Sequence, residues 1–282
     1  MQLDLMAIVN GVEGQLVLAA ILAFLAATAA YGLKMLTLRG ATAAFFLGFV
    51  TFGLGGLEWA LVLLTFFFTS SFLSILFGKR KRAAEKMYAK GGRRDAAQVL
   101  ANGGVAGISA IIHAIYPNSV LPWLFFCGAL AAANADTWAT ELGVLNRRPP
   151  IMITNGKPVE AGSSGAISLT GTLAALAGSV LIGLLCWQLV PSGAPIPFGF
   201  WMITFSGLFG SLVDSFLGAT VQAIYYCPTC LKETERHPRH GCGSETTLLR
   251  GKPWINNEVV NLACTLSASV IAFLFYLIVR IA

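Results

Sequence analysis

Charged residues are scarce in this chain. They make up 11% of its 282 residues, whereas a soluble globular domain carries roughly 25%. Hydrophobic residues make up 56%, and the mean hydropathy is +0.73. This composition excludes an ordinary soluble domain. It predicts a polytopic membrane protein, because about 20 apolar residues are needed for each helical crossing of the bilayer.

Several familiar sequence signals are also missing. No basic segment precedes the first apolar run, which follows Asp4 and contains Glu13, so we expect no cleaved signal peptide. No Walker or protein-kinase motif is present, which excludes those soluble nucleotide-binding folds. The net charge of +6 comes without a nucleic-acid-binding motif. We therefore expect no nucleic-acid partner and interpret the charge as a signal of membrane topology.

The apolar runs predict one integral membrane domain over residues 1–282, with an all-α fold of about eight transmembrane helices. The stretch 41–77 is too long for one ordinary span and is interrupted around Gly53, Gly55, Gly56 and Glu58. We divide it into two spans. The predicted spans are 15–33, 41–56, 57–77, 96–114, 120–142, 164–190, 198–224 and 257–281.

Four loops of this arrangement carry almost all of the positive charge. Loops 34–40, 78–94, 143–163 and 225–256 contain two, eight, three and five Lys and Arg residues, which is 18 of the 19 in the chain. The positive-inside rule places these loops in the cytoplasm and both termini outside a cell (inner) membrane. The densest run extends from Lys79 to Arg94. We expect it to anchor on anionic headgroups, with a smaller contribution to steering an anionic substrate.

Two predicted spans carry carboxylates, which are costly in a membrane and indicate function. Asp136 lies about 10 Å before the end of its span at 1.5 Å per residue, with Asn134, Thr137 and Glu141 on a neighbouring face. Asp214 lies about 15 Å before the end of its predicted span by the same rise, and Ser211 shares its face.

Three other predicted spans begin at the cytoplasmic side with polar, glycine-rich sequence. Helix N-termini present free N–H groups and a positive dipole end, which favour phosphate. Lys157, in the loop before one of them, could add positive charge. The candidate phosphate-binding residues in these segments are Asn102, then Gly162, Ser163, Ser164, Gly165 and Ser168, and finally Asn256, Asn257 and Asn261.

Carboxylates and phosphate-binding groups at one membrane face have an economical interpretation. Asp136 and Asp214 would hold Mg²⁺, and Mg²⁺ would hold phosphate oxygens. The predicted site lies in the inner half of the bilayer, where the phosphate of a lipid can reach it.

Half of the six cysteines lie in one polar loop. Cys227 and Cys230 have the spacing of a zinc knuckle, and His240 and Cys242 follow. We predict a structural Zn²⁺ site in the loop 225–256, with His237 as the alternative to His240. A thiol-redox role for the Cys-Pro-Thr-Cys sequence and the absence of any metal stay open.

The longer motifs carry a resemblance to a known family. NADTWATELG (134–143), the following ITNGKPVEAGSSGAISLTGT, GSLVDSFLGATVQ (210–222) and INNEVVN are similar to the integral membrane family that includes plant phytyl-phosphate kinase and animal transmembrane protein 19. The similarity covers most of the chain and is strongest over about 91–265. The cysteine loop is similar to that of some prokaryotic members and is not expected in the plant enzyme.

The resemblance implies a kinase that converts an isoprenyl monophosphate to the diphosphate, with CTP as the expected nucleoside triphosphate donor. It implies that Asp136 and Asp214 hold Mg²⁺. Asn134, Glu141 and Asn257 would complete or orient that metal shell. Lys157 and the Gly162–Gly165 segment would bind phosphate.

Three other activities remain open. A polyprenol kinase would use Asp136 or Asp214 as a base toward a lipid alcohol. A cytidylyltransferase would form a CDP-lipid and release pyrophosphate. A transporter would use the carboxylates for ion coupling, although the polar groups gather toward one leaflet and do not mark a midplane path.

Overall fold

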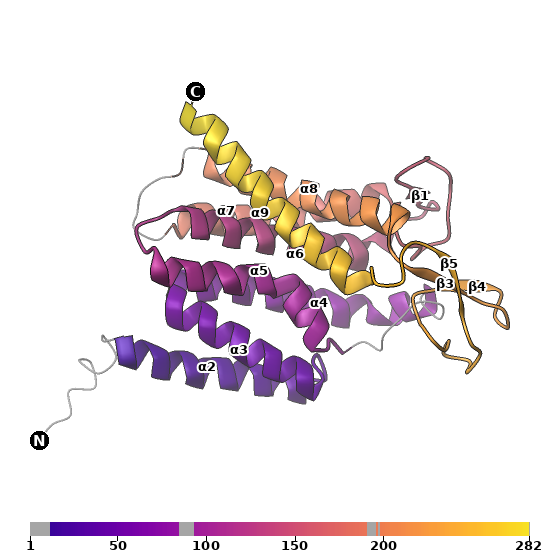
Figure 1. The fold of residues 1–282 in the computed structure, drawn as a ribbon, viewed down its shortest axis with the longest axis horizontal. Helices are drawn as coiled ribbons and strands as arrows, with labels where there is room; N and C mark the ends of the chain where they lie inside the picture. The colour runs from indigo at the N-terminus through magenta and orange to yellow at the C-terminus, as the bar shows by residue number, and fades with distance from the viewer. Residues whose placement is uncertain (1–11, 85–92, 191–195, 197, 282) are drawn as a thin grey trace, which may run out of the picture.

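The computed structural model describes residues 12–84, 93–190, 196 and 198–281. Eight long helices account for most of this part of the chain (Figure 1). Each predicted span corresponds to one of them, which confirms the predicted membrane-helical fold. The helices are α2 (Val12–Gly32), α3 (Leu38–Gly55), α4 (Leu57–Ala84), α5 (Ala96–Ile115), α6 (Leu121–Gly143), α7 (Leu169–Gln188), α8 (Gly199–Thr220) and α9 (Asn257–Ile281).

The break inside the stretch 41–77 is a tight turn at Gly56. This residue has a φ of 89°, which favours glycine, and its N–H donates to the carbonyl oxygen of Phe52 at 2.9 Å. Helix α4 begins at the next residue, with Glu58 in its first turn. The prediction of two spans in this stretch is confirmed.

Two predicted boundaries were wrong. The span predicted over 164–190 begins as a helix only at Leu169, because the hydroxyl of Ser168 accepts the N–H of Gly171 at 3.1 Å and caps the helix there. The span predicted over 198–224 ends as a helix at Thr220, and the chain continues into a strand from Ile224.

Five short strands lie in the loops. Strands β1 (Ile151–Met152) and β2 (Ala166–Ile167) pair antiparallel. In the second sheet β3 (Ile224–Cys227) lies between β4 (Lys232–Thr234) and β5 (Thr247–Arg250), and both pairs are antiparallel. These strands are extramembrane additions to a membrane domain that is helical in its described part.

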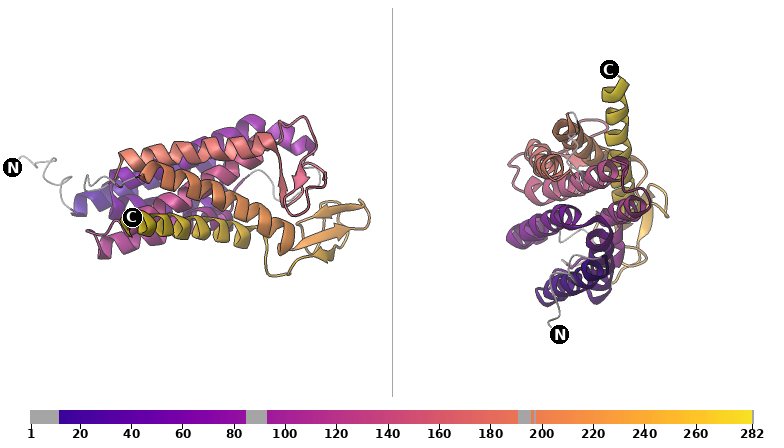
Figure 2. Two further views of the ribbon diagram at one scale, coloured as in Figure 1. Left: turned by 90° about the horizontal axis from the view of Figure 1, so that it is seen from above. Right: turned by 90° about the vertical axis from the view of Figure 1, so that its left-hand side faces the viewer.

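The described parts of the four basic loops lie at one end of the helix bundle, where both small sheets also lie (Figures 1 and 2). The N–H of Thr37 donates to the carbonyl oxygen of Arg94 at 3.0 Å, and the N–H of Arg94 donates to that of Met35 at 2.9 Å. The loop after α2 and the loop before α5 therefore contact each other. This contact requires an even number of crossings between them. The start of α2 and the end of α9 lie at the opposite end.

Helix α6 lies in the middle of the bundle and contacts α4, α5, α7, α8 and α9. Seven of the described helices are long and apolar enough to cross a membrane, and α6 is outside this set. Its neighbours shield it from lipid, so it can carry polar residues that an outer helix could not. Small residues bring the backbones close, since a Cβ on Gly210 would lie 2.7 Å from that of Ala132.

The end of the bundle away from the basic loops is closed by large apolar side chains. Trp59 and Trp123 are buried with ring centroids 5.2 Å apart. The indole N–H of Trp123 donates to the carbonyl oxygen of Cys186 at 3.2 Å. Cys127 and Cys186 are buried in the same cluster and contribute to its packing.

Candidate functional site

A cavity of about 2400 Å³ opens at the loop end of the bundle. Its wall combines the C-terminal halves of α4, α6 and α8 with the N-terminal turns of α5, α7 and α9. The turn 162–168 and the β3–β4–β5 loop complete it. Of the residues singled out from the sequence, those that line the cavity are Asp136, Thr137, Glu141, Gly162, Ser163, Ser164, Gly165, Ser168, Ser211, Asp214, Cys230, His237, His240, Cys242, Asn256, Asn257 and Asn261.

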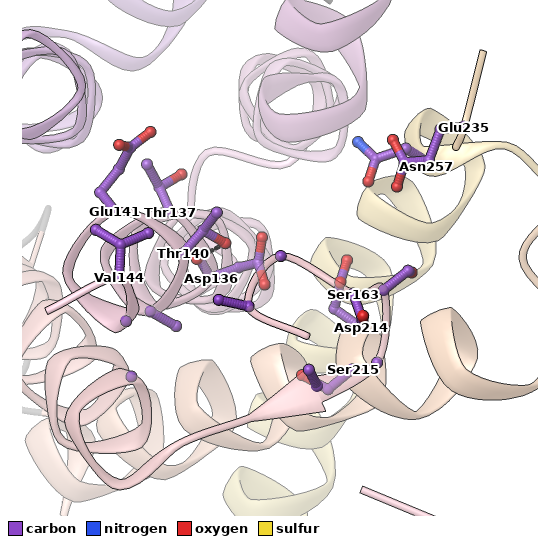
Figure 3. Close-up of a pocket in the computed structure, with 18 of the residues that line it drawn as sticks. Asp136, Thr137, Thr140, Glu141, Val144, Ser163, Asp214, Ser215, Glu235 and Asn257 are labelled. Atoms are coloured by element: carbon purple, nitrogen blue, oxygen red, sulfur yellow. Dashed lines mark hydrogen bonds between the residues drawn. The ribbon is translucent and has the colours of Figure 1, made fainter. Parts of the chain in front are cut away.

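Asp136 and Asp214 project into this cavity from α6 and α8 (Figure 3). Because α8 ends at Thr220, Asp214 lies about 9 Å from the helix end, and Asp136 lies at a similar depth of about 10 Å. The two carboxylates repel each other electrostatically. Oδ2 of Asp214 is buried, and no hydrogen-bond donor of the described residues reaches it. Such a pair favours a bound cation.

Glu141 lies one helical turn beyond Thr137 and faces α4. Its Oε1 accepts the hydroxyl of Ser74 at 2.8 Å. Burial lowers the pKa of the Arg94 guanidinium, and the charge of Glu141 opposes that shift. Arginine stays protonated in such a setting. Glu141 therefore has a charged neighbour at the cavity wall and is less available to a metal than Asp214.

The segment 162–168 is a turn followed by strand β2, rather than the beginning of a helix. Gly165 has a φ of 85°, and a Cβ there would clash with the backbone of Ala219. The turn consequently rests on the end of α8. The guanidinium of Arg250 holds it there, donating to the carbonyl oxygens of Ser164 at 3.1 Å and Gly218 at 2.7 Å. Glycine is required at this position for both reasons.

The first turn of α9 forms another part of the wall. Oδ1 of Asn256 accepts the N–H of Val259 at 3.0 Å, as a helix N-cap does. Asn257, Glu258 and Asn261 follow and line the cavity. The amide of Asn257 therefore lines the same cavity as the two aspartates (Figure 3).

Positive side chains that the sequence analysis did not select also line the cavity. They come from all four basic loops. Their position in these loops was the feature of the sequence that could have identified them. The charge had been interpreted as topology, with substrate steering as a minor role for the Lys79–Arg94 run alone. Much of that run lies outside the described residues. The lining cations are Lys34, Arg93, Arg94, Arg147, Arg148, Arg236 and Arg239.

Three predicted site residues do not line the cavity. The amide of Asn134 is fully buried and joins three helices, donating to the carbonyl oxygen of Gly178 at 2.8 Å and accepting the hydroxyl of Ser70 at 3.2 Å. The amide of Asn102 donates to the carbonyl oxygen of Gln98 in its own helix. Lys157 is exposed in the β1–β2 loop. Sequence spacing did not reveal that these side chains point elsewhere.

The Cys227, Cys230, His240 and Cys242 side chains converge as expected for a metal site. Their ligand atoms all lie within 4.8 Å of one another. The sulfurs of Cys227 and Cys242 are 3.6 Å apart, and Nδ1 of His240 lies 3.4 Å from the sulfur of Cys230. Tetrahedral zinc with Zn–S bonds of about 2.3 Å separates two sulfurs by about 3.8 Å. The four side chains therefore fit a metal ion.

Comparison with known proteins identifies the family. The family described as integral membrane protein DUF92 matches residues 21–269. The chain belongs to this family. Every cavity-lining residue lies between Leu33 and Asn261, so the whole cavity falls within the part shared with DUF92. The resemblance inferred from the motifs is confirmed.

Relatives of the chain occur in plants and archaea. Protein PGR of Arabidopsis thaliana is 33% identical over 238 residues, covering 76% of this chain and 81% of that protein. An uncharacterized membrane protein of Methanocaldococcus jannaschii is 31% identical over 238 residues, covering 84% of each. Protein VTE6, chloroplastic, of A. thaliana is 25% identical over 247 residues, covering 85% of this chain and 65% of that protein. No solved structure matches the chain significantly.

Proposed function

We propose that the protein is an isoprenyl monophosphate kinase of the phytyl or geranylgeranyl type. The observation that carries this proposal is the composition of the cavity. Two membrane-embedded carboxylates, one with a buried oxygen that no donor of the described residues reaches, share it with cations from four loops. A nucleoside triphosphate and a lipid monophosphate bound together need such a mixture, because a divalent cation and fixed positive charge must together offset the charge of their phosphates.

The proposed reaction transfers the γ-phosphoryl group of a nucleoside triphosphate, with CTP as the expected donor. An oxygen of the lipid monophosphate forms the new bond to the γ-phosphorus. The bond from that phosphorus to the β-phosphate oxygen breaks, and the nucleoside diphosphate leaves. The acceptor is already ionised, so no strong general base is required, and catalysis consists of positioning and charge neutralisation.

The side chains divide this work by charge. Asp136 and Asp214 would hold Mg²⁺, which would act as a Lewis acid and offset the charge of the phosphates. Ser163, Asn257 and Asn261 would orient phosphate oxygens or metal-bound water. Arg94 and Arg147 would bind phosphate oxygens at the opposite wall.

The cavity wall also contains the apolar surface that a lipid substrate needs. Ile75 of α4, Val144 and the α8 residues Leu208 and Leu212 lie among the polar lining residues. An isoprenyl chain could contact this surface while its phosphate remains among the cations. This arrangement supports a membrane lipid, rather than a soluble phosphate ester, as the acceptor.

We further propose that the Cys/His cluster holds structural Zn²⁺ and that the cavity end faces the cytoplasm. Zinc is supported by the four convergent ligands and their spacing. The orientation is supported by the distribution of Lys and Arg, of which 18 of 19 belong to the loops at this end. A nucleotide donor is available on that side.

The test is label transfer by detergent-purified protein in the presence of Mg²⁺. CTP, ATP and UTP labelled at the γ-phosphate are each offered with geranylgeranyl or phytyl monophosphate, and Asp136→Asn protein is run in parallel. We expect label in a lipid diphosphate, highest with CTP, and its loss in the variant.

Other outcomes would replace the proposal with a named alternative. Label transferred only to the lipid alcohol would indicate a polyprenol kinase. Release of pyrophosphate with formation of a CDP-lipid would indicate a cytidylyltransferase. Nucleotide-independent uptake into proteoliposomes, without transfer to any acceptor, would indicate a transporter.

A further inference from the structure

His237 is not one of the convergent metal ligands, although it lies in the loop that carries them. It was the alternative to His240 in the zinc site predicted from the sequence. In the structure the ligand atoms that converge are those of Cys227, Cys230, His240 and Cys242. Neither the metal site nor the proposed reaction therefore gives the imidazole of His237 a role.

The imidazole of His237 instead stacks on the phenol ring of Tyr225 in strand β3. The ring centroids are 4.4 Å apart, and the ring planes are inclined by 13°. Both residues line the cavity. Tyr225 is buried, whereas His237 is exposed. Because Tyr225 covers one face of the imidazole, the opposite face is the one that is open to the cavity.

Both rings are held in place by contacts outside the stack. Tyr225 belongs to β3, the central strand of the three-stranded sheet. On the other side the backbone around His237 is tied to Thr246. The hydroxyl of Thr246 donates to the carbonyl oxygen of Arg236 at 3.0 Å, and its N–H donates to that of Pro238 at 3.0 Å. An aromatic surface that is fixed before a ligand arrives costs little to order on binding.

Cationic side chains accompany the stack. Arg236 and Arg239 lie one and two residues from His237 and also line the cavity. The sheet that carries the stack lies beyond the ends of α8 and α9 (Figures 1 and 2), whereas Asp136 and Asp214 lie within helices. Positive charge beside an exposed aromatic surface is how proteins bind nucleotides without reading their sequence.

One cavity connects the stack with the two aspartates. Its volume of about 2400 Å³ exceeds the roughly 300–1,000 Å³ of an ordinary small-molecule pocket, which leaves room for a nucleotide beside a lipid headgroup. The phosphates of the nucleotide would extend toward the carboxylates and their cation, while the base would remain at the outer end. An isoprenyl phosphate has no aromatic ring to place on the stack, so the stack suits the donor.

We infer that the stack of His237 on Tyr225 is the docking platform for the base of the nucleoside triphosphate donor, which lies on the open face of the imidazole. Stacking uses the π-face that every base has. The platform therefore contributes affinity for the donor without selecting cytosine. This inference rests on the proposed function, which supplies the nucleotide, and it gives the metal-binding loop a part in holding the donor.

The experiment compares the binding of CTP and of inorganic tripolyphosphate to the full-length protein in detergent, by calorimetry with Mg²⁺ and without lipid. Tripolyphosphate has the phosphate chain of the nucleotide but no base. His237→Ala should weaken CTP binding about tenfold and leave tripolyphosphate binding unchanged. His237→Phe should keep the CTP affinity within about twofold of wild type, because a phenyl ring also stacks on a base. Zinc content is measured in every sample.

The matched control is His113→Ala. His113 also stacks on an aromatic ring, that of Trp59, with centroids 4.9 Å apart, but it is not among the residues that line the cavity. Its replacement should leave CTP affinity unchanged. An equal loss of CTP and tripolyphosphate affinity in His237→Ala would overturn the platform, because the side chain would then act through charge or loop structure. Loss of zinc in that variant would also overturn it, by making His237 a metal ligand.

The platform and the proposed function fail differently in this experiment. If wild-type protein binds CTP and His237→Ala binds it equally well, the platform is excluded and the nucleotide donor stands. If wild-type protein binds none of CTP, ATP and UTP, the nucleotide-dependent reaction itself is excluded, and the platform with it.

Discussion

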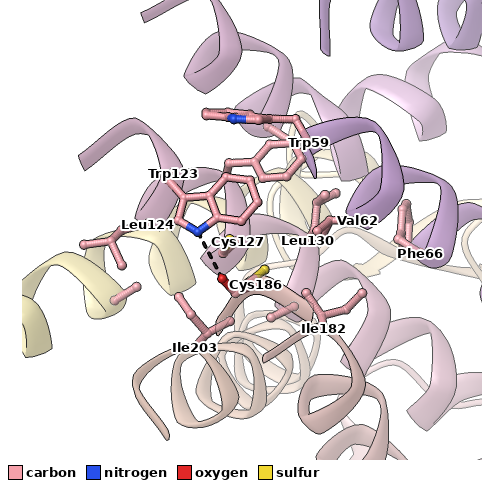
Figure 4. Close-up of a cluster of buried hydrophobic side chains, with 14 of the residues drawn as sticks. Trp59, Val62, Phe66, Trp123, Leu124, Cys127, Leu130, Ile182, Cys186 and Ile203 are labelled. Carbon is pink, nitrogen blue, oxygen red and sulfur yellow. Dashed lines mark hydrogen bonds between the residues drawn. The ribbon is translucent and has the colours of Figure 1, made fainter. Parts of the chain in front are cut away.

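The two halves of α6 are one helix in opposite surroundings. In the first half Trp123, Phe126 and Leu130 are buried to within 2% exposure and pack in the closed apolar cluster (Figure 4). In the second half Asp136 and Glu141 line a cavity. Because α6 contacts five other helices of the bundle, we attribute the difference between its halves to these neighbours and not to lipid.

Helix α4 shows how the two halves are made different. Along its apolar part it presents Trp59, Val62 and Phe66 to α6. Further along it presents Ser70 and Ser74, which donate to Asn134 and Glu141. Large side chains close one end of the bundle by packing, while small hydroxyl residues at the other end bind polar groups and leave space. We therefore expect mutations in the apolar cluster to change stability and mutations in the cavity to change activity.

The largest effect is expected from Asp214→Asn. The change keeps the shape of the side chain but removes the charge beside Asp136, so the cation should be lost and the rate of phosphoryl transfer should fall about 1000-fold. Turnover per folded molecule measures this, with thermal unfolding in detergent as the control for folding. Activity within tenfold of wild type would remove Asp214 from the cation site.

Trp123→Ala should have the opposite signature. It leaves a cavity in the apolar cluster and deletes the hydrogen bond to the carbonyl oxygen of Cys186, so the free energy of unfolding should fall by roughly 3–5 kcal/mol. The KM values of the molecules that remain folded should be unchanged. Altered KM values at full stability would mean that the two ends are coupled.

Asn134→Ala tests a residue at the border of the two halves. Because its amide connects α4, α6 and α7, we expect a loss of about 1.5 kcal/mol of stability with little change in substrate affinity. The control is Asn102→Ala, since that amide bonds only within its own helix. Loss of phosphate affinity without loss of stability would return Asn134 to the binding site.

The smallest effect is expected from replacing one of the lining cations. Arg94→Ala removes a guanidinium beside Glu141 and should raise the KM for an anionic substrate about tenfold. Lys157→Ala removes a positive charge outside the cavity and should change KM less than about twofold. Initial rates at low and moderate salt give both values. Equal effects of the two changes would indicate nonspecific attraction.

Much of the fold was predictable because its signals are local. Runs of apolar residues define the helices, and the glycines near residue 56 mark the tight turn. Asp136 and Asp214 could be selected because carboxylates in membrane spans are rare. The cysteine spacing identified the four convergent ligands. Each of these inferences needs only the neighbouring sequence.

The other parts of the candidate site depend on contacts between segments that are distant in sequence, which local patterns do not reveal. Lys157 and the Gly162–Gly165 segment are adjacent in sequence, yet only the latter lines the cavity. Arg94 enters the wall because its backbone pairs with Met35 and Thr37 across a helix hairpin. Glu235 lines the cavity and accepts a hydrogen bond from Gln222, which lies 13 residues earlier. Its position between metal ligands was the sequence signal that could have drawn attention to it.

The most direct test of the account is an experimental structure with Mg²⁺ and a non-hydrolysable CTP analogue. We predict metal density between the carboxylates of Asp136 and Asp214, with the triphosphate extending toward the arginines of the basic loops. The account would be contradicted if metal and nucleotide bound elsewhere and the cavity beside the polar half of α6 held only solvent. This cavity would then not be the phosphoryl-transfer site.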